Sequence, residues 1–239
     1  MPILYKFIEG AYGNIYVPKP GAFTRGIVLD NTPAAIEDFR SKYLGEDTFT
    51  SIFSYNNSPD GKLNPKQKVY GPFYMDISID NNLLMAQKVT RRVLIELSKY
   101  VPLLYIEVQF SGMRGFHIEI APEIFGIEPC VDLPQTFASM AKEIGKTANV
   151  LTPYVSTQNS FSIYKHNQLW RLTNSVHSLS KLYKIPLSSY TAIEYRPDYI
   201  LTKAKAPQFN VQVPKVRAPI PYAKSFYQRM RSSQSELYA

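Results

Sequence analysis

The sequence predicts an α+β protein with a mixed or antiparallel sheet. Its 239 residues are 45% hydrophobic and include 18 Tyr and 13 Phe, enough apolar side chain for a packed core and typical of substantial sheet. Apolar and polar residues alternate over residues 48–55, 71–80 and 105–110, as in half-buried strands. Helical periodicity occupies a few segments between them. The order strand, helix, strand, strand, helix, strands does not favour a doubly wound fold.

The N-terminal part is predicted to form irregular strands and one helix. Strands are expected at residues 3–8, 14–17, 26–29 and 48–55. A helix is expected over residues 34–44, because Pro33 occupies an early position where its missing N–H costs nothing and Gly45 follows as a stop. Turn-forming residues at 56–61 and a polar loop at 62–68 then lead into the next strand.

The central part carries the remaining expected elements. A helix begins after Asn82 and buries a face of apolar residues at helical spacing up to Leu97. A second helix is expected over residues 132–145. The extended or strand segments are residues 71–80, 105–110, 116–120, 154–164, 169–172 and 182–187.

Composition shifts divide the chain into a domain of residues 1–202 and a basic tail of residues 203–239. Within the domain we expect an N-terminal module, residues 1–70, and a motif-bearing sheet, residues 71–202. The tail has four prolines between residues 203 and 222, predicting an extended wrap, and then a short basic helix over residues 225–237. Such an ending also suggests further domains of a longer chain.

Several classes of protein are disfavoured. No run approaches about 18 apolar residues, so no membrane span and no membrane partner are expected. The N-terminus lacks a basic region followed by an apolar signal core. Cys130, the single cysteine, excludes an internal disulfide and a CxxC metal site. We therefore expect a cytoplasmic protein.

Positive charge favours a polyanionic partner. The net charge is +8, and residues 203–235 contain seven Lys or Arg and no acid. A second cluster, Lys62, Lys66 and Lys68, lies in the predicted loop. Clustered cations release counterions from a nucleic-acid backbone, although ordinary solubility charge is an alternative.

Acidic and hydroxyl side chains mark the end of the 71–80 strand. Alternation places Asp76, Ser78 and Asp80 on one face. Residues at i and i+4 are roughly 13 Å apart along a strand, so Asp76 and Asp80 do not share one metal ion unless the strand bends. Asp80 as a helix cap and Asp76 as a solvated acid is the structural alternative.

Two further segments have the residue types of a phosphate site. The first is the turn from Ser111 to His117, in which Gly112 and Gly115 allow backbone N–H groups to approach an anion, and Arg114 and His117 add donors. A plain hairpin is its structural alternative. The second segment combines cations, an amide and an imidazole: Arg171, Asn174, His177, Lys181 and Lys184.

These three segments together resemble the motifs of the archaeo-eukaryotic primase superfamily. The resembling stretches are Asp76-Ile-Ser-Ile-Asp80, Phe110-Ser-Gly-Met-Arg-Gly-Phe-His117-Ile118, and Tyr164 to Lys184. The likeness covers roughly residues 45–190 and is strongest to primase-polymerases of mobile elements and CRISPR-associated loci.

The resemblance implies an N-terminal module beside an RNA-recognition-like sheet with flanking helices. It also implies template-directed nucleotidyl transfer with Mg²⁺ or Mn²⁺ held by three acids. Ser111, Arg114, Gly115, His117, Arg171, Asn174, His177 and Lys184 would then bind a nucleoside triphosphate. On their charge, Lys62, Lys66, Lys68, Lys181 and the basic tail are expected to bind a single-stranded DNA template and primer. Tyr55, Phe73 and Tyr74 are candidates for stacking on bases, with core packing an alternative for Phe73.

This chain departs from the family at the metal. Ser78 and Ser160 stand where the family has its second and third acids, so Asp76 alone remains at the expected catalytic and metal-binding positions. Glu107 and Glu119, on neighbouring predicted strands, are possible substitutes. We therefore expect a primase-polymerase domain, a nucleotidyltransferase by resemblance, with its metal site disabled. The alternatives are a non-catalytic nucleic-acid or nucleotide-binding subunit of a replication or defence assembly, and an interaction scaffold.

Overall fold

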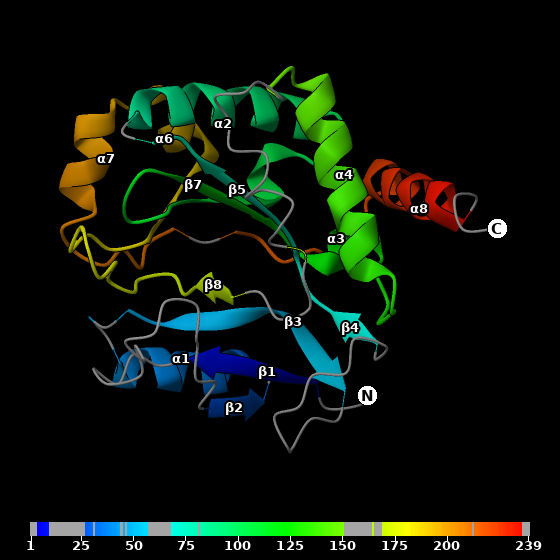
Figure 1. Ribbon diagram of the computed structural model, residues 1–239, viewed down its shortest axis with the longest axis horizontal. Coiled ribbons are helices and arrows are strands. Elements are labelled where there is room, and N and C mark those ends of the chain that lie inside the picture. Colours follow the sequence, from blue (N-terminus) through cyan, green and yellow to red (C-terminus); the bar gives the residue numbers. More distant parts are fainter. Residues whose placement is uncertain are drawn as a thin grey trace.

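A computed structural model describes residues 4–9, 27–30, 32–43, 45, 47–56, 68–80, 82–150, 164, 169–211 and 213–235. Two antiparallel sheets lie one above the other, with most helices on the far side of the second sheet (Figure 1). The predicted α+β class, with antiparallel sheets and flanking helices, is confirmed.

The first sheet contains the N-terminal strands and one strand from much later in the chain. Its order is β2-β1-β3-β4, and β8 pairs with β3 on another path. The bounds are β1 Leu4–Glu9, β2 Ile27–Asp30, β3 Phe49–Asn56, β4 Val69–Tyr70 and β8 Leu169–Arg171. Helix α1, Pro33–Lys42, precedes β3 and begins at Thr32, whose hydroxyl accepts a hydrogen bond from Ala35 N. The sheet of N-terminal strands is therefore completed by β8.

The second sheet has the order β5-β7-β6-β9 and is antiparallel throughout. Its strands are β5 Phe73–Ser78, β6 Ile106–Phe110, β7 Gly115–Ile120 and β9 Ile185–Leu187. Alternation gives it one apolar face, with Phe73, Met75 and Ile77 from β5. The other face is polar, with Tyr74, Asp76 and Ser78 from the same strand.

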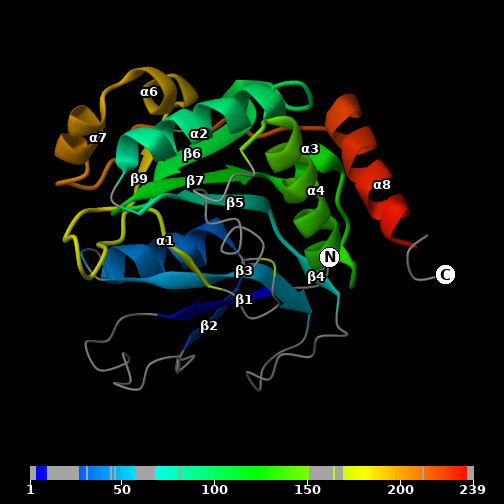
Figure 2. The same ribbon diagram turned by 45° about the horizontal axis from the view of Figure 1, so that its top comes forward.

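Helices cover the apolar face (Figures 1 and 2). They include α2 Leu83–Leu97, α4 Leu133–Thr147 and α6 Ser189–Glu194. Asn82 caps α2 by accepting a hydrogen bond from Met85 N at 2.9 Å. The buried sides of α2 and α4 are apolar, so the main core lies between these helices and the sheet.

The end of the described chain is also packed against the protein. Helix α8, Pro221–Ser235, contacts α4 and the short helix α3, Pro122–Phe125. Ala223, Phe226 and Tyr227 of α8 are buried. The basic helix thus exists and begins four residues earlier than predicted. The proposed division of the chain at residue 202 stays a prediction.

Other sequence predictions have mixed outcomes. Helices α6 and α7, Pro197–Lys203, were not predicted. The expected strand at residues 14–17 and nearly all of the segment 154–164 lie outside the described residues. Within the described part, no helix is both long and apolar enough to cross a membrane.

Candidate functional site

The polar face of the second sheet brings the first two sequence motifs together. In the β5–β7 register Asp76 lies opposite His117, and Ser78 lies opposite Gly115. The two motifs therefore share one face. His117 Nε2 is 3.8 Å from Asp76 Oδ1, and His117 is buried while the Asp76 side chain keeps 24% exposure.

Gly112 and Gly115 allow the β6–β7 turn and the start of β7 to pack closely against neighbouring segments. A Cβ on Gly115 would collide with the backbone of Ile77 and Ser78, so only glycine lets β7 pair tightly with the end of β5. Gly112 has φ +93°, and a Cβ there would lie 3.1 Å from His177 Cβ. The turn between β6 and β7 thus packs against the third motif segment.

Lys184 connects the two sheets from a fully buried position. Its Nζ donates to Arg171 O at 2.6 Å and lies 4.8 Å from the centre of the Trp170 ring. The Trp170 ring is in turn 4.0 Å from the His117 ring. Side chains of β8 therefore contact the polar face of the second sheet next to Asp76.

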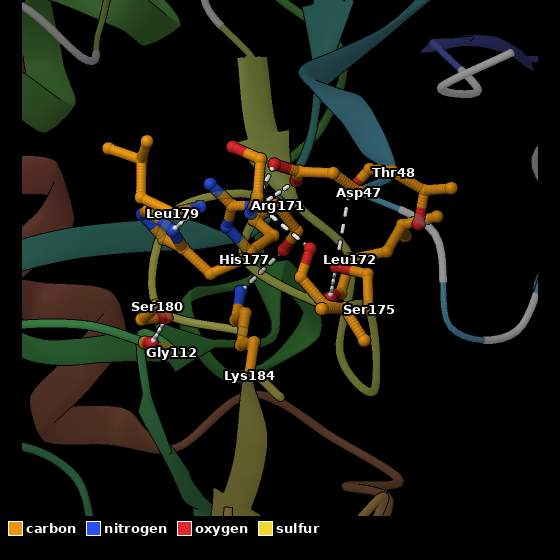
Figure 3. A network of polar contacts seen from close by, with 12 residues as sticks. Asp47, Thr48, Gly112, Arg171, Leu172, Ser175, His177, Leu179, Ser180 and Lys184 are labelled. Atoms are coloured by element: carbon orange, nitrogen blue, oxygen red, sulfur yellow. Dashed lines mark hydrogen bonds and ion pairs between the residues drawn. The ribbon is translucent and has the colours of Figure 1, made fainter. Parts of the chain in front are cut away.

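Arg171 forms an ion pair with Asp47, an acid that the sequence analysis did not single out (Figure 3). Both side chains are almost completely buried, and the Arg171 guanidinium also lies 4.5 Å from the Phe49 ring centre. Asp47 Oδ2 accepts a further hydrogen bond from Ser178 N at 3.0 Å. A lone acid before a strand carries no motif, so sequence alone offered no signal for it.

The segment between β8 and β9 surrounds the turn. Ser180 Oγ donates to Gly112 O, and His177 Nδ1 accepts from Leu179 N at 3.2 Å (Figure 3). Asn174 is buried, with φ +65°, and exchanges hydrogen bonds with the Gln208 backbone at 2.9 and 3.0 Å. Its side chain is thus occupied in holding the chain after α7.

Burial shifts the pKa values of Asp76 and Lys184. It raises the pKa of Asp76 to about 6, against the opposing effect of Lys184 and Arg114. It lowers the pKa of Lys184 to about 7, against the opposing effect of Glu119 and Glu107. Burial therefore opposes the charged form of both Asp76 and Lys184.

Both histidines of the site are neutral at pH 7. Burial, followed by the positive charge of Lys184, lowers the pKa of His117 well below its ordinary value. Partial burial, followed by Arg171 and Arg114, lowers the pKa of His177 to about 4. Neither imidazole therefore supplies a positive charge to an anion at this pH.

Arg114 is the cation of the second motif that is accessible to solvent. Its side chain is 45% exposed and pairs with Asp80, which is 81% exposed. An exposed pair of this kind contributes only about 0–1 kcal/mol, so an incoming phosphate can replace the carboxylate. Asp80 does not cap α2, because the N-cap of that helix is Asn82.

The described residues do not fit a metal pair. No group of three His, Cys, Asp or Glu in the described part of the chain is placed to hold a metal ion. Asp80 is turned to Arg114, and Ser78 offers only a hydroxyl beside Asp76. Glu107 and Glu119 lie opposite one another, and Glu119 lies opposite Tyr74 rather than Asp76.

The remaining predicted residues are dispersed. Ser111 N closes the turn on Gly115 O at 2.9 Å, and Lys68 and Lys181 are exposed. Ser160, Lys62 and Lys66 lie outside the described residues, as does the side chain of Tyr55. The stacking role for Phe73 and Tyr74 is wrong, because both rings are buried in the core, where Phe73 contacts Phe137.

Three buried polar atoms at this face lack hydrogen-bond partners among the described residues. They are Gln109 Oε1, His117 Nδ1 and Trp170 Nε1. Gln109 lies opposite His117 in the β6–β7 register, and Trp170 stacks on His117, so all three belong to one neighbourhood. Unused polar atoms of this kind are typical of a site that binds water or a ligand.

No protein-family model matches the chain, and no curated protein sequence matches it. Among solved structures, the chain is similar to the polymerase domain from Mycobacterium tuberculosis Ligase D in complex with DNA. The TM-score is 0.48 and the sequence identity 15%, over 84% of this chain and 80% of that one. A similarity of this degree assigns neither a family nor an activity.

Proposed function

We propose that the chain is a template-directed primase-polymerase domain that keeps its triphosphate-binding residues and has a disabled metal site. The observation that supports this most is the convergence of three separate sequence motifs. Asp76 and Ser78 share a strand pair with Gly115 and His117, and the Arg171–Lys184 segment packs against the same turn.

Phosphate binding is the activity that the described side chains can perform. Arg114 supplies an exposed guanidinium. Backbone N–H groups of the Gly112–Gly115 turn are proposed as further donors. His177 is neutral, and because its Nδ1 accepts from Leu179 N, its Nε2 carries the proton and can donate one hydrogen bond without adding charge. Lys184 and Arg171 bind other groups of the same chain, so they stabilise the site and add positive electrostatic potential to it.

Nucleotidyl transfer requires more carboxylates than the described part of the chain provides. The serines at positions 78 and 160 remove two negative charges from positions where the resembling family has acids. Their removal eases the approach of a triphosphate and a template, both polyanions. The chain is therefore expected to bind template and triphosphate without turnover.

Restoring both acids tests the proposal. Ser78→Asp/Ser160→Asp should synthesise primers on single-stranded DNA with Mg²⁺ or Mn²⁺, whereas the wild-type chain should bind template and triphosphate without synthesis. Ser78→Asn/Ser160→Asn is the matched control, since it adds similar volume without charge. If the restored variant folds and binds triphosphate but makes no primer, a disabled polymerase is the wrong description.

A non-catalytic binding subunit is the second candidate. It is favoured by the Asp80–Arg114 ion pair, which engages the other acid of the first motif. Tight, salt-sensitive binding of oligonucleotide by the wild-type and restored chains, with synthesis by neither, would support this candidate.

A further inference from the structure

An exposed row of aromatic rings runs along helices α6 and α7. We call Tyr190, Tyr195 and Tyr199 the aromatic row; they are 68%, 39% and 40% exposed, and Phe209, which is 55% exposed, follows them in the sequence. The rings of Tyr195 and Tyr199 are 4.5 Å apart and tilted by 31°. Tyr190 meets Tyr195 edge to face at 6.2 Å. Single exposed aromatics are ordinary, but neighbouring rings in mutual contact are a built surface.

The backbone beneath the row is firmly held. Gln87 of α2 donates from Nε2 to Ala192 O at 2.9 Å and also to Tyr195 O. Ala192 and Ile200 are completely buried on the inner sides of α6 and α7. The rings are therefore exposed because the other side of each helix is anchored in the core.

Cations alternate with the rings toward the candidate site. Lys203 Nζ lies 5.5 Å from the centre of the Tyr199 ring, and Lys205 is exposed before Phe209. The acids on these helices are Glu194 and Asp198, both exposed, and Asp198 pairs with Arg196 at 3.5 Å. Positive charge is thus concentrated at the Lys203 end of the row.

The Lys203 end of the aromatic row is connected by hydrogen bonds to the candidate site. Tyr183 N donates to Ala204 O at 2.8 Å, and Asn174 binds the backbone of Gln208, the neighbour of Phe209. Both views show α7 beside the segment that leads from β8 to β9 (Figures 1 and 2). A ligand lying on the row would therefore lead to the Arg114 turn.

We propose that the aromatic row binds single-stranded nucleic acid, with bases stacked on the tyrosines and phosphates at Lys203 and Lys205. The choice of partner rests on the proposed function, and the binding surface is a new assignment. Flat rings accept any base, and lysines between them neutralise the backbone, so the expected binding is independent of sequence. The row supplies the stacking surface that the buried Phe73 and Tyr74 cannot.

The test uses the full chain and two fluorescent strands of equal length, an oligothymidylate and its abasic counterpart. Tyr195→Ala/Tyr199→Ala should weaken oligothymidylate binding about tenfold or more, because stacking contributes about 1–3 kcal/mol per base. The abasic strand should bind the double variant as it binds wild type. Tyr195→Phe/Tyr199→Phe should restore oligothymidylate affinity, since it restores both rings.

Tyr222→Ala is the matched control, because Tyr222 is a 75% exposed tyrosine on α8, away from the row. The proposal is overturned if the double alanine variant binds oligothymidylate like wild type, or if it loses the same factor with the abasic strand. An equal loss in Tyr222→Ala also overturns it. The proposal is also overturned if a proline-rich peptide binds wild type more tightly than the double alanine variant, while oligothymidylate binds both equally. Triphosphate binding is measured in parallel, so that a failure of the proposed function can be distinguished from a failure of the aromatic row.

Discussion

At the scale of single residues, the candidate site is defined by buried groups whose charge is costly. Asp76 and His117 were predicted as site residues in two separate motifs, and the structure pairs them in the β5–β7 register. The Asp47–Arg171 pair was not foreseeable, because its two members lie more than a hundred residues apart and no local pattern links them.

Asp76→Asn should stabilise the protein in a pH-dependent way. The pKa of Asp76 is raised in the folded state from 3.8 to about 6, so the folded protein pays no penalty below pH 3.8 and the full penalty above pH 6. The variant should therefore exceed wild type by about 1–3 kcal/mol in free energy of unfolding at pH 8, and match it near pH 3.5. Urea denaturation at both pH values measures this.

Asp198→Asn provides the control, since Asp198 is an exposed acid. It should change the free energy of unfolding little at either pH. An Asp76→Asn variant with the same stability as wild type at pH 8 would contradict the assigned burial of this carboxylate.

At the scale of elements, strands were predicted better than short helices. Strands β5, β6 and β7 alternate clearly and were expected close to their observed bounds. Helices α6 and α7 span only six and seven residues, too few for a helical pattern, and Gln87 of α2 holds the end of α6 from outside. The pairing of β8 with β3 joins distant parts of the chain and had no local signal.

The segment between β8 and β9 should depend on Asp47. Asp47→Ala leaves the Arg171 guanidinium nearly buried without its carboxylate and removes the acceptor of Ser178 N. The expected cost is about 3–5 kcal/mol in free energy of unfolding, measured by urea denaturation. Asp198→Ala breaks an exposed pair with Arg196 and should cost less than about 1 kcal/mol. Similar small costs for both variants would mean that Asp47 does not hold this segment.

At the scale of the whole molecule, two antiparallel sheets enclose the candidate site. The second sheet directs its apolar face to α2, α4 and α6, and its polar face to Trp170 and Lys184. Sequence patterns predicted the α+β class and the residue types of the site. They did not predict which residues become internal supports, because burial of Lys184 and Arg171 follows from packing one sheet on another.

The most direct test of the account is the affinity of a nucleoside triphosphate for wild type and for Arg114→Ala, measured by calorimetric titration. Arg91→Ala is the control, because Arg91 is exposed on α2, the helix that covers the opposite face of the second sheet. The account predicts binding by wild type and Arg91→Ala. Arg114→Ala should bind about tenfold or more weakly, since a charge-assisted hydrogen bond contributes about 1.5–3 kcal/mol. Equal affinity in all three chains, or no binding by wild type, would contradict the central claim that the Arg114 turn is a phosphate site.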